Sequence, residues 1–307
     1  MDPATTDEDA PLWHRLARPL AATFVGLESH QVVTRAMRVS GLADFGPMDF
    51  AEPLEILCRS LERDAHVHPV GRVRARRRLV DALVARARQE QLLEERSAIV
   101  DAPVATPIVI IGLPHAGGSL LRDRLADEPG SRAPPTDHDL LAPSLASMEF
   151  EVDWHVPAFA EWYDSADLTH AYQRLRTTLQ VLDGEGPSDP SDRWVIEGWQ
   201  HVEQLGAIAN AFPDAVIVQV HRDPDAVLAE WVDTVARRRR ESSDRVAPEQ
   251  LAKYWEWRLD VMLARATHYR AEHPELDVYD VAWDELRDDA AGVVERISRD
   301  SPPRNPS

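Results

Sequence analysis

Four short runs rich in β-branched residues, each followed by a helical pattern, constrain the fold of this chain most strongly. The runs span 107–112, 193–197, 215–221 and 277–283, and the helical stretches after them begin at Leu120 or span 200–211, 224–240 and 284–299. Runs of this length are typical of strands buried in a parallel sheet. Alternating strands and helices are joined by right-handed crossovers. The sequence therefore predicts an α/β fold with a central parallel sheet.

The segment before the first of these runs predicts helices and no strand. Residues 53–63 and 74–95 place their leucines and valines on one helical stripe, and the acidic first residues are typical of disorder. The expected organisation is a disordered tail at 1–12, a helical region at 13–104, an α/β domain at 105–300 and a second disordered tail at 301–307.

Three other segments matter for the core and the surface. The arginine cluster Arg72–Arg78 is either a phosphate patch or, as we favour, a solvated helix face that pairs with the acids of Glu90–Glu95. The helix at 247–272 carries a core stripe. An aromatic group near residue 160 either lines an apolar pocket or, as we favour, belongs to the core. The stripe is Leu251, Trp255, Leu259, Met262 and Leu263, and the aromatic group is Trp154, Phe159, Trp162 and Tyr163.

The charge balance narrows the range of partners. Asp and Glu number 53 against 34 Lys and Arg, a formal net charge of −19, and Lys253 is the only lysine. General binders of nucleic acid or of anionic membranes need a positive field, so we expect neither partner. A small, local anion site remains compatible with this composition.

Cysteine and targeting signals point to an ordinary cytoplasmic protein. Cys58 is the only cysteine, which excludes an internal disulfide and a cysteine zinc cluster. The N-terminus lacks a basic-then-apolar signal pattern, and no apolar run is long enough to span a membrane. We expect a cytoplasmic location.

A glycine-rich loop follows the first strand run. Gly112 to Ser119 has the spacing of the nucleotide loop G-x-x-x-x-G-K-[ST], but Gly118 stands where that loop has its lysine. Without the lysine, ATP or GTP hydrolysis is disfavoured. The glycine turn and the helix N-terminus can still hold an anion, and the alternative is an ordinary strand-to-helix turn.

A second anion signal lies at the end of the third strand run. Arg222 offers a planar fork of donors suited to phosphate, or it forms a structural ion pair with Asp223 or Asp225. Ligands of open α/β sheets bind beyond the carboxyl ends of the strands. We therefore expect residues 112–119, 197–201 and 221–223 to meet at one crevice.

Three blocks of the sequence together resemble the sulfotransferase family, in its bacterial branch with a helical N-terminal region. PIVIIGLPHAGGSLL (107–121) resembles the family's 5′-phosphosulfate loop, usually G-x-P-[RK]-[ST]-G-T-[ST], and FPDAVIVQVHRDP (212–224) resembles its 3′-phosphate block. Residues 42–100, with DFGPMDF (44–50) and EPLE (52–55), are similar to the helical region that precedes the loop. The resemblance implies a P-loop-like three-layer fold with a central parallel sheet. It also implies metal-free transfer of a sulfuryl group from 3′-phosphoadenosine 5′-phosphosulfate (PAPS) to a hydroxyl or amine of a small-molecule acceptor.

The resemblance also assigns roles to residues. Arg222 would bind the 3′-phosphate together with Glu230, which stands where the family has a serine, and either Asp139 or His138 would be the base. His115 takes the place of the loop's Lys or Arg, and Glu197 that of a family lysine. A histidine is mostly neutral near pH 7 unless its environment favours the cation. The residues implied for the 5′-phosphosulfate are Gly112, Pro114, His115, Gly117, Gly118 and Ser119.

The substituted residues leave a second hypothesis open. A carboxylate about 4–6 Å from a phosphate costs on the order of 3–4 kcal/mol at an effective dielectric near 20, whereas micromolar binding is worth about 8 kcal/mol. Glu197 and Glu230 together could therefore cancel nucleotide binding. The alternative to an active sulfotransferase is a catalytically impaired scaffold of the same fold that binds another ligand or a protein partner. A P-loop phosphotransferase is disfavoured by the missing lysine.

Overall fold

The computed structural model describes residues 25–99, 101–134, 140–185 and 192–300. The chain forms two compact units, each built from segments that are distant in the sequence. The first comprises Met1–Glu95, Leu141–Asp167 and Val232–Lys253, and the second comprises Arg96–Leu140, Leu168–Trp231 and Tyr254–Ser307. No helix in the described ranges is long and apolar enough to cross a membrane. The tails expected at 1–12 and 301–307 lie outside the described residues.

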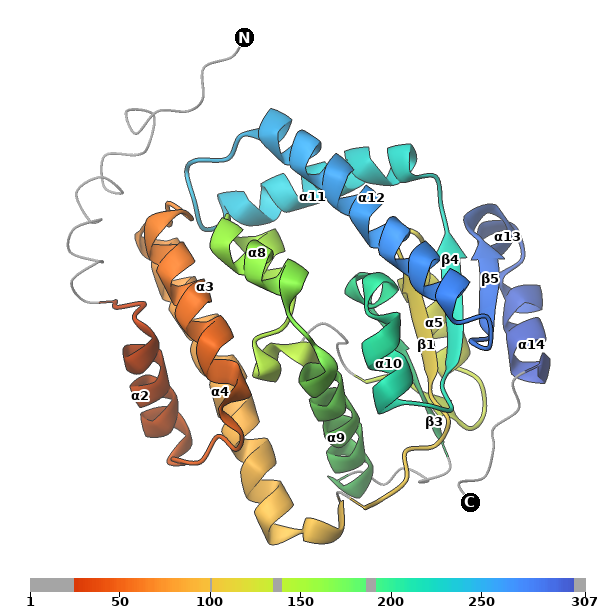
Figure 1. Cartoon of the computed structure of the whole chain (residues 1–307), viewed down its shortest axis with the longest axis horizontal. Coiled ribbons are helices and arrows are strands. Elements are labelled where there is room, and N and C mark those ends of the chain that lie inside the picture. Colours follow the sequence, from red (N-terminus) through yellow and green to blue (C-terminus); the bar gives the residue numbers. More distant parts are fainter. Residues whose placement is uncertain (1–24, 100, 135–139, 186–191, 301–307) are drawn as a thin grey trace. The chain divides into compact units, whose positions relative to one another are not determined.

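A five-stranded, all-parallel sheet is the centre of the second unit (Figure 1). Its order is β2-β3-β1-β4-β5, and every residue of β1 is buried. The bounds are β1 (Ile108–Gly112), β2 (Ser131–Arg132), β3 (Arg193–Glu197), β4 (Val216–His221) and β5 (Val278–Ala282). The four strands predicted from β-branched runs are confirmed, and β2 is an addition that the sequence did not predict. The predicted α/β fold with a central parallel sheet is confirmed.

Helices of the second unit cover this sheet. Helix α5 (Gly118–Ala126) packs against β1, β2 and β3 and contacts α14, while α10 and α12 cross in front of the sheet in Figure 1. The remaining bounds are η2 (Ser97–Ile99), α9 (Thr169–Glu185), η4 (Trp199–Glu203), α10 (Leu205–Ala211), α13 (Trp283–Asp288) and α14 (Ala290–Asp300). Helices α11 (Pro224–Arg240) and α12 (Pro248–Glu272) each have residues in both units. The core stripe predicted on 247–272 is confirmed for its buried members, Leu251, Trp255, Leu259 and Met262.

Two of the predicted helices are interrupted. The stretch 200–211 begins as the 3₁₀ turn η4 and becomes α10 only after Gln204, whose ψ of 28° is not helical. The stretch 284–299 divides into α13 and α14 at Asp289. The carboxylate of Asp289 accepts a hydrogen bond from the backbone N–H of Gly292 at 2.9 Å. A short acidic side chain competes in this way with the continuing helix and caps the next one.

The first unit is helical, as predicted for its N-terminal part. Its described residues form no strand beyond an isolated bridge between Val67 and Ser243. The elements are α2 (Ser29–Ser40), η1 (Met48–Phe50), α3 (Ala51–Arg63), α4 (Pro69–Glu95), η3 (Ala142–Ser144), α7 (Glu149–Asp153) and α8 (Pro157–Ser165). Helices α3 and α4 confirm the two helices read from the sequence.

Aromatic side chains fill the core of the first unit. Trp154, Phe159 and Tyr163 are at most 1% exposed, and Phe150 packs edge-to-face on Phe159. The core interpretation of these aromatic residues is therefore confirmed for all but the half-buried Trp162. Burial also raises the pKa of the Cys58 thiol to about 12, which keeps it protonated at neutral pH.

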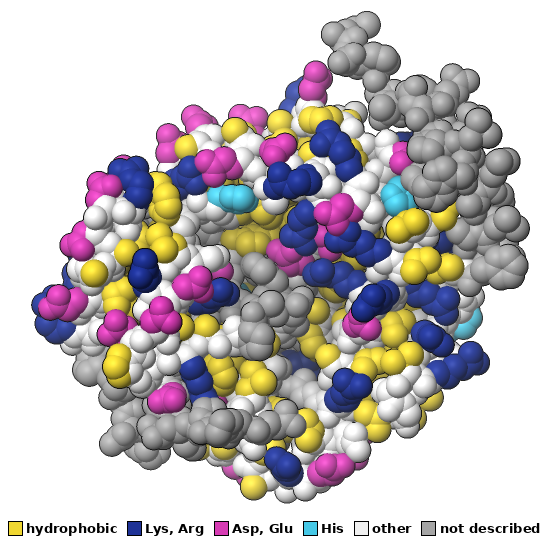
Figure 2. Space-filling view, turned by 180° about the vertical axis from the view of Figure 1, so that it is seen from behind, with side chains coloured by type: hydrophobic (Ala, Val, Ile, Leu, Met, Phe, Trp, Pro, Cys, Tyr) yellow, Lys and Arg dark blue, Asp and Glu magenta, His cyan; other side chains and the backbone are white. Residues whose placement is uncertain are grey.

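The arginine cluster on α4 pairs with carboxylates, but not with those we expected. Arg72 pairs with Glu62, and Arg74 with Glu241. Arg77 and Arg78 pair with Asp81 and Asp153. The predicted pairing with Glu90–Glu95 is wrong for these four side chains, because carboxylates on other elements and one turn along α4 lie closer. On the face shown in Figure 2, basic and acidic side chains are likewise interspersed.

Arg86 of α4 is the buried polar centre of the first unit. Its side chain is fully buried, and its Nε donates to the carbonyl oxygen of Phe45 at 2.6 Å. Its two terminal nitrogens donate to the carbonyl oxygens of Pro47 and Pro143 and to the carboxylate of Asp49. One guanidinium therefore holds the segment before α3 and the turn η3 against α4.

We predict that Arg86→Ala lowers the free energy of unfolding by about 3–5 kcal/mol, because it leaves several buried acceptors and one carboxylate without their donor. Urea denaturation followed by circular dichroism measures this change. The matched control is Arg77→Ala, which removes an exposed pair with Asp81 and should cost no more than about 0.5 kcal/mol. Equal losses in the two variants would contradict the role assigned to Arg86.

Candidate anion-binding site at the strand ends

The loop between β1 and α5 adopts backbone conformations that favour glycine. His115 and Gly117 adopt positive φ angles of 59° and 102°. A Cβ added at Gly117 would lie 2.5 Å from ring atoms of Trp283, and one added at Gly112 would lie 2.7 Å from the carbonyl oxygen of Val220. The glycines therefore let the loop fold tightly onto α13 and β4. The loop ends at the N-terminus of α5, whose first N–H groups lack helical acceptors and favour negative charge.

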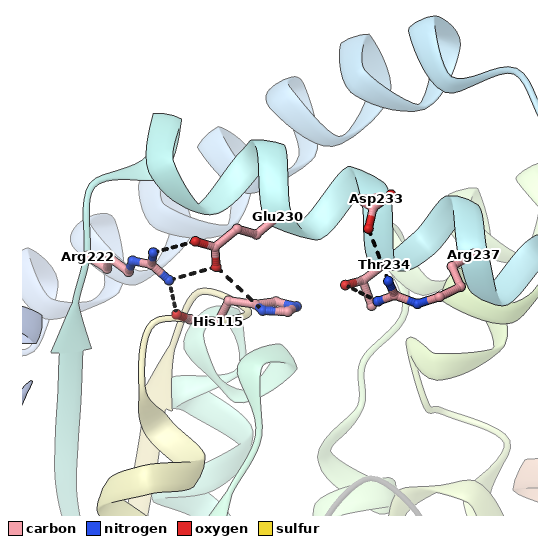
Figure 3. Close-up of polar contacts among 6 residues, drawn as sticks. All are labelled: His115, Arg222, Glu230, Asp233, Thr234 and Arg237. Atoms are coloured by element: carbon pink, nitrogen blue, oxygen red, sulfur yellow. Dashed lines mark hydrogen bonds and ion pairs between the residues drawn. The ribbon is translucent and has the colours of Figure 1, made fainter.

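Arg222 stands beside this loop, immediately after β4. Its Nη1 donates to the carbonyl oxygen of His115 at 2.7 Å. The same fork binds Glu230 through two hydrogen bonds, at 3.0 Å and 2.6 Å (Figure 3). The guanidinium carbon also lies 5.3 Å from the ring centre of Trp283, so one indole supports both the loop and the arginine. Arg222 thus has a fixed position and a direct bond to the loop.

Helix α11 places Glu230 opposite Arg222. Pro224 begins the helix, and the Asp223 carboxylate accepts a hydrogen bond from the backbone N–H of Asp225 at 3.0 Å. Glu230 lies two turns further along, where the hydrogen bonds from Arg222 hold the pKa of its carboxyl below the usual range. The structural ion pair given as the alternative to phosphate binding forms with Glu230 rather than with Asp223 or Asp225, since Asp223 caps the helix.

His115 faces the same carboxylate from the loop. Its Nδ1 is 3.7 Å from Oε2 of Glu230, and its ring meets the edge of Trp231 at 5.7 Å between centres. Trp231 packs in turn on Trp199 and Trp255. The Glu230 carboxylate therefore lies between Arg222 and His115 (Figure 3).

A second carboxylate, that of Glu197, lies at the N-terminus of α5. Ser119 donates its hydroxyl hydrogen to Oε2 of Glu197 at 3.2 Å. A Cβ added at Gly118 would lie 2.9 Å from Oε1 of Glu197, so the carboxylate reaches the first turn of the helix. Negative charge is favoured there by the helix dipole. An anion at this site would bind the α5 N-terminus and Arg222. Each of these two groups thus has a protein carboxylate beside it.

The structure brings most of the predicted site residues together. The carboxyl ends of β1, β3 and β4 carry the loop, Glu197 and Arg222 to one edge, as the strand order requires. Pro114 is buried within the loop. His138 and Asp139 lie outside the described residues. Among the residues that the structure describes, no group of three or more His, Cys, Asp or Glu side chains is arranged to hold a metal ion.

Sequence reasoning missed Trp283 and a polar cluster on β4 and β5. The same rule about strand ends would have found Trp283, because it directly follows β5. The cluster joins His221 to Asp280 at 2.6 Å and Arg270 to both oxygens of Asp280 at 2.8 Å. The hydrogen bonds from Arg270 are the main cause of the lowered pKa of Asp280.

Comparison with known proteins identifies the family. Residues 107–300, more than half of the chain, match the sulfotransferase family. The chain belongs to the sulfotransferase family. No curated protein matches it by sequence.

Two solved sulfotransferases share its fold along most of their length. Sulfotransferase STF1 from Mycobacterium tuberculosis H37Rv is 25% identical, with a TM-score of 0.80 over 88% of each chain. Sulfotransferase STF9 from Mycobacterium avium is 18% identical, with a TM-score of 0.82 over 90% of this chain and 84% of that one. Sulfotransferases in general use the polyanion PAPS, so the two carboxylates at this site are the feature that needs an explanation.

We predict that Gly117→Ala lowers the free energy of unfolding by about 2–4 kcal/mol, because it combines a positive φ with a clash against Trp283. Gly118→Ala is the matched control. Its added Cβ meets only the flexible side chain of Glu197, so it should stay within about 1 kcal/mol of wild type. Thermal and urea midpoints of the three proteins measure the difference. A Gly117→Ala protein as stable as Gly118→Ala would contradict this account of the loop.

Proposed function

We propose that this protein is an active sulfotransferase that moves a sulfuryl group from an adenosine 5′-phosphosulfate donor, PAPS in the family at large, to a hydroxyl or amine of a small-molecule acceptor. The observation that carries this proposal is the hydrogen bond from Arg222 to the carbonyl oxygen of His115. It joins the glycine loop and the arginine at one edge of the sheet, at the ends of β1 and β4, so that the 5′ end and the ribose of one donor nucleotide can both contact the protein there.

The loop residues are proposed to hold the 5′-phosphosulfate. Gly112, Pro114 and Gly117 shape the turn, while the N–H groups at Gly118 and Ser119 would donate to the anion. The Ser119 hydroxyl would do so only by leaving Glu197. Charge spreads over the transferred group and the leaving phosphate in the transition state, so fixed donors accelerate the step. His115 stands where the family loop carries a cation.

The proposed reaction is a single in-line displacement. The acceptor oxygen or nitrogen forms a bond to sulfur while the bond from sulfur to the 5′-phosphate oxygen breaks, and the nucleotide leaves with the electron pair. A base must take the acceptor's proton as it attacks. Asp139 and His138 are the proposed bases on the family resemblance alone, since neither is among the described residues.

A second candidate function has its own observation. Glu230 already engages the fork of Arg222, and Glu197 already accepts the Ser119 hydroxyl. Both carboxylates satisfy groups that a donor nucleotide would otherwise bind. This arrangement favours a catalytically impaired scaffold of the sulfotransferase fold, which binds another ligand or a protein partner.

Calorimetric titration with 3′-phosphoadenosine 5′-phosphate and with AMP, the leaving nucleotides of the two possible donors, separates these functions. We predict that at least one nucleotide binds wild type with a Kd below 1 mM. Gly118→Asp should weaken that binding at least tenfold, because it adds a carboxylate at the N-terminus of α5. The control is Arg237→Ala, whose arginine pairs with Asp233 and Thr234 on α11 (Figure 3) and should leave binding unchanged.

If neither nucleotide binds wild type at millimolar concentration, the sulfotransferase proposal is contradicted and the scaffold function is the one supported. Where binding is found, transfer of ³⁵S from labelled donor to a panel of phenols, alcohols and amines completes the test.

A further inference from the structure

We infer that the nucleotide site of this protein selects a donor with a free ribose 3′-hydroxyl, of the adenosine 5′-phosphosulfate class, over one with a 3′-phosphate, and that Glu230 is the selecting residue. This inference rests on the proposed function, since it concerns the same site. It depends mainly on one of the site's departures from the family, the position where Glu230 replaces a serine.

The first step concerns the fork of Arg222. An arginine binds phosphate through parallel hydrogen bonds from its two terminal nitrogens. Both of these nitrogens already donate to the two carboxylate oxygens of Glu230, and Nη1 also donates to the carbonyl oxygen of His115. The two donors that would bind a phosphate are therefore already bonded to Glu230. The net charge of the Arg222–Glu230 pair is zero.

The second step concerns which group an incoming ribose meets. The side chain of Arg222 is 17% exposed, whereas that of Glu230 is 48% exposed. The carboxylate is therefore the accessible half of the pair. It remains ionised at neutral pH, because the hydrogen bonds from Arg222 lower its pKa.

The third step concerns what a carboxylate can recognise. An ionised carboxylate only accepts hydrogen bonds, as does a phosphate dianion, whereas a ribose hydroxyl donates one. The same chemistry distinguishes dinucleotide sites, in which an acidic residue holds a free ribose hydroxyl and an arginine accommodates a phosphate at that position. Glu230 therefore accepts a hydrogen bond from the 3′-hydroxyl of an unphosphorylated ribose, and its negative charge repels a 3′-phosphate.

The charge of the rest of the site favours the same nucleotide. Glu197 lies at the N-terminus of α5 and accepts the Ser119 hydroxyl, so the loop tolerates less negative charge than a loop without it. A phosphate monoester adds about −1.5 to −2 charges at neutral pH. The donor without a 3′-phosphate therefore adds less negative charge to a site that already contains two carboxylates.

The test compares the affinities of AMP and 3′-phosphoadenosine 5′-phosphate by calorimetry at one salt concentration. In wild type we expect AMP to bind at least tenfold more tightly. Glu230→Ser frees the fork of Arg222, so the 3′-phosphorylated nucleotide should become at least tenfold tighter than AMP. Glu230→Gln keeps the side-chain volume without the charge and should bring the two affinities within about threefold.

The matched control is Asp233→Ser, which removes one exposed carboxylate from the same helix and should leave the AMP preference as in wild type. Tighter or equal binding of the 3′-phosphorylated nucleotide by wild type would overturn the inference and leave the proposed function standing. A preference that does not change in Glu230→Ser would overturn it as well. If wild type binds neither nucleotide, the proposed function and this inference fail together.

Discussion

The hydrogen bond from Arg222 to the carbonyl oxygen of His115 is the contact on which the geometry of the site depends. That carbonyl belongs to a turn in which His115 adopts a positive φ, and the turn can close because Gly117 lets Trp283 approach. Trp283 also packs beneath the guanidinium. The loop after β1, the end of β4 and the start of α13 are therefore held together by one polar bond and one indole.

Glu230 gives the guanidinium of Arg222 an anionic partner from within the protein. A largely buried guanidinium loses part of its hydration, and it needs an anionic or hydrogen-bonding partner in return. In a site designed for phosphate, the ligand supplies that partner. Here α11 supplies it from within the protein, so a phosphate must compete with a carboxylate that is already positioned. The inferred discrimination against a 3′-phosphate rests on this competition.

Strands β1, β3 and β4 were predictable from the sequence because burial on both faces favours β-branched runs. Strand β5, at the edge of the sheet and only partly buried, was predictable from its short β-branched run alone. The two-residue strand β2 contains no β-branched run. It was not predictable because it is defined only by its pairing with β3. The break at Asp289 arises from a side-chain cap that competes with helical periodicity. The partner of Arg222 was missed because Asp223 and Asp225 are nearer in sequence, whereas helix geometry brings Glu230 to the fork.

The fold and the charge of the site are therefore set by different residues. Strand order and glycines decide where the loop and the backbone of Arg222 lie, whereas the residue at position 230 decides which partner the guanidinium has. That residue lies on the exposed surface of α11, where a substitution changes the ligand's surroundings with little effect on the core. A change from hydroxyl to carboxylate at such a position can reverse which nucleotide is accepted while leaving the sulfotransferase fold intact, which is why family membership alone does not identify the donor.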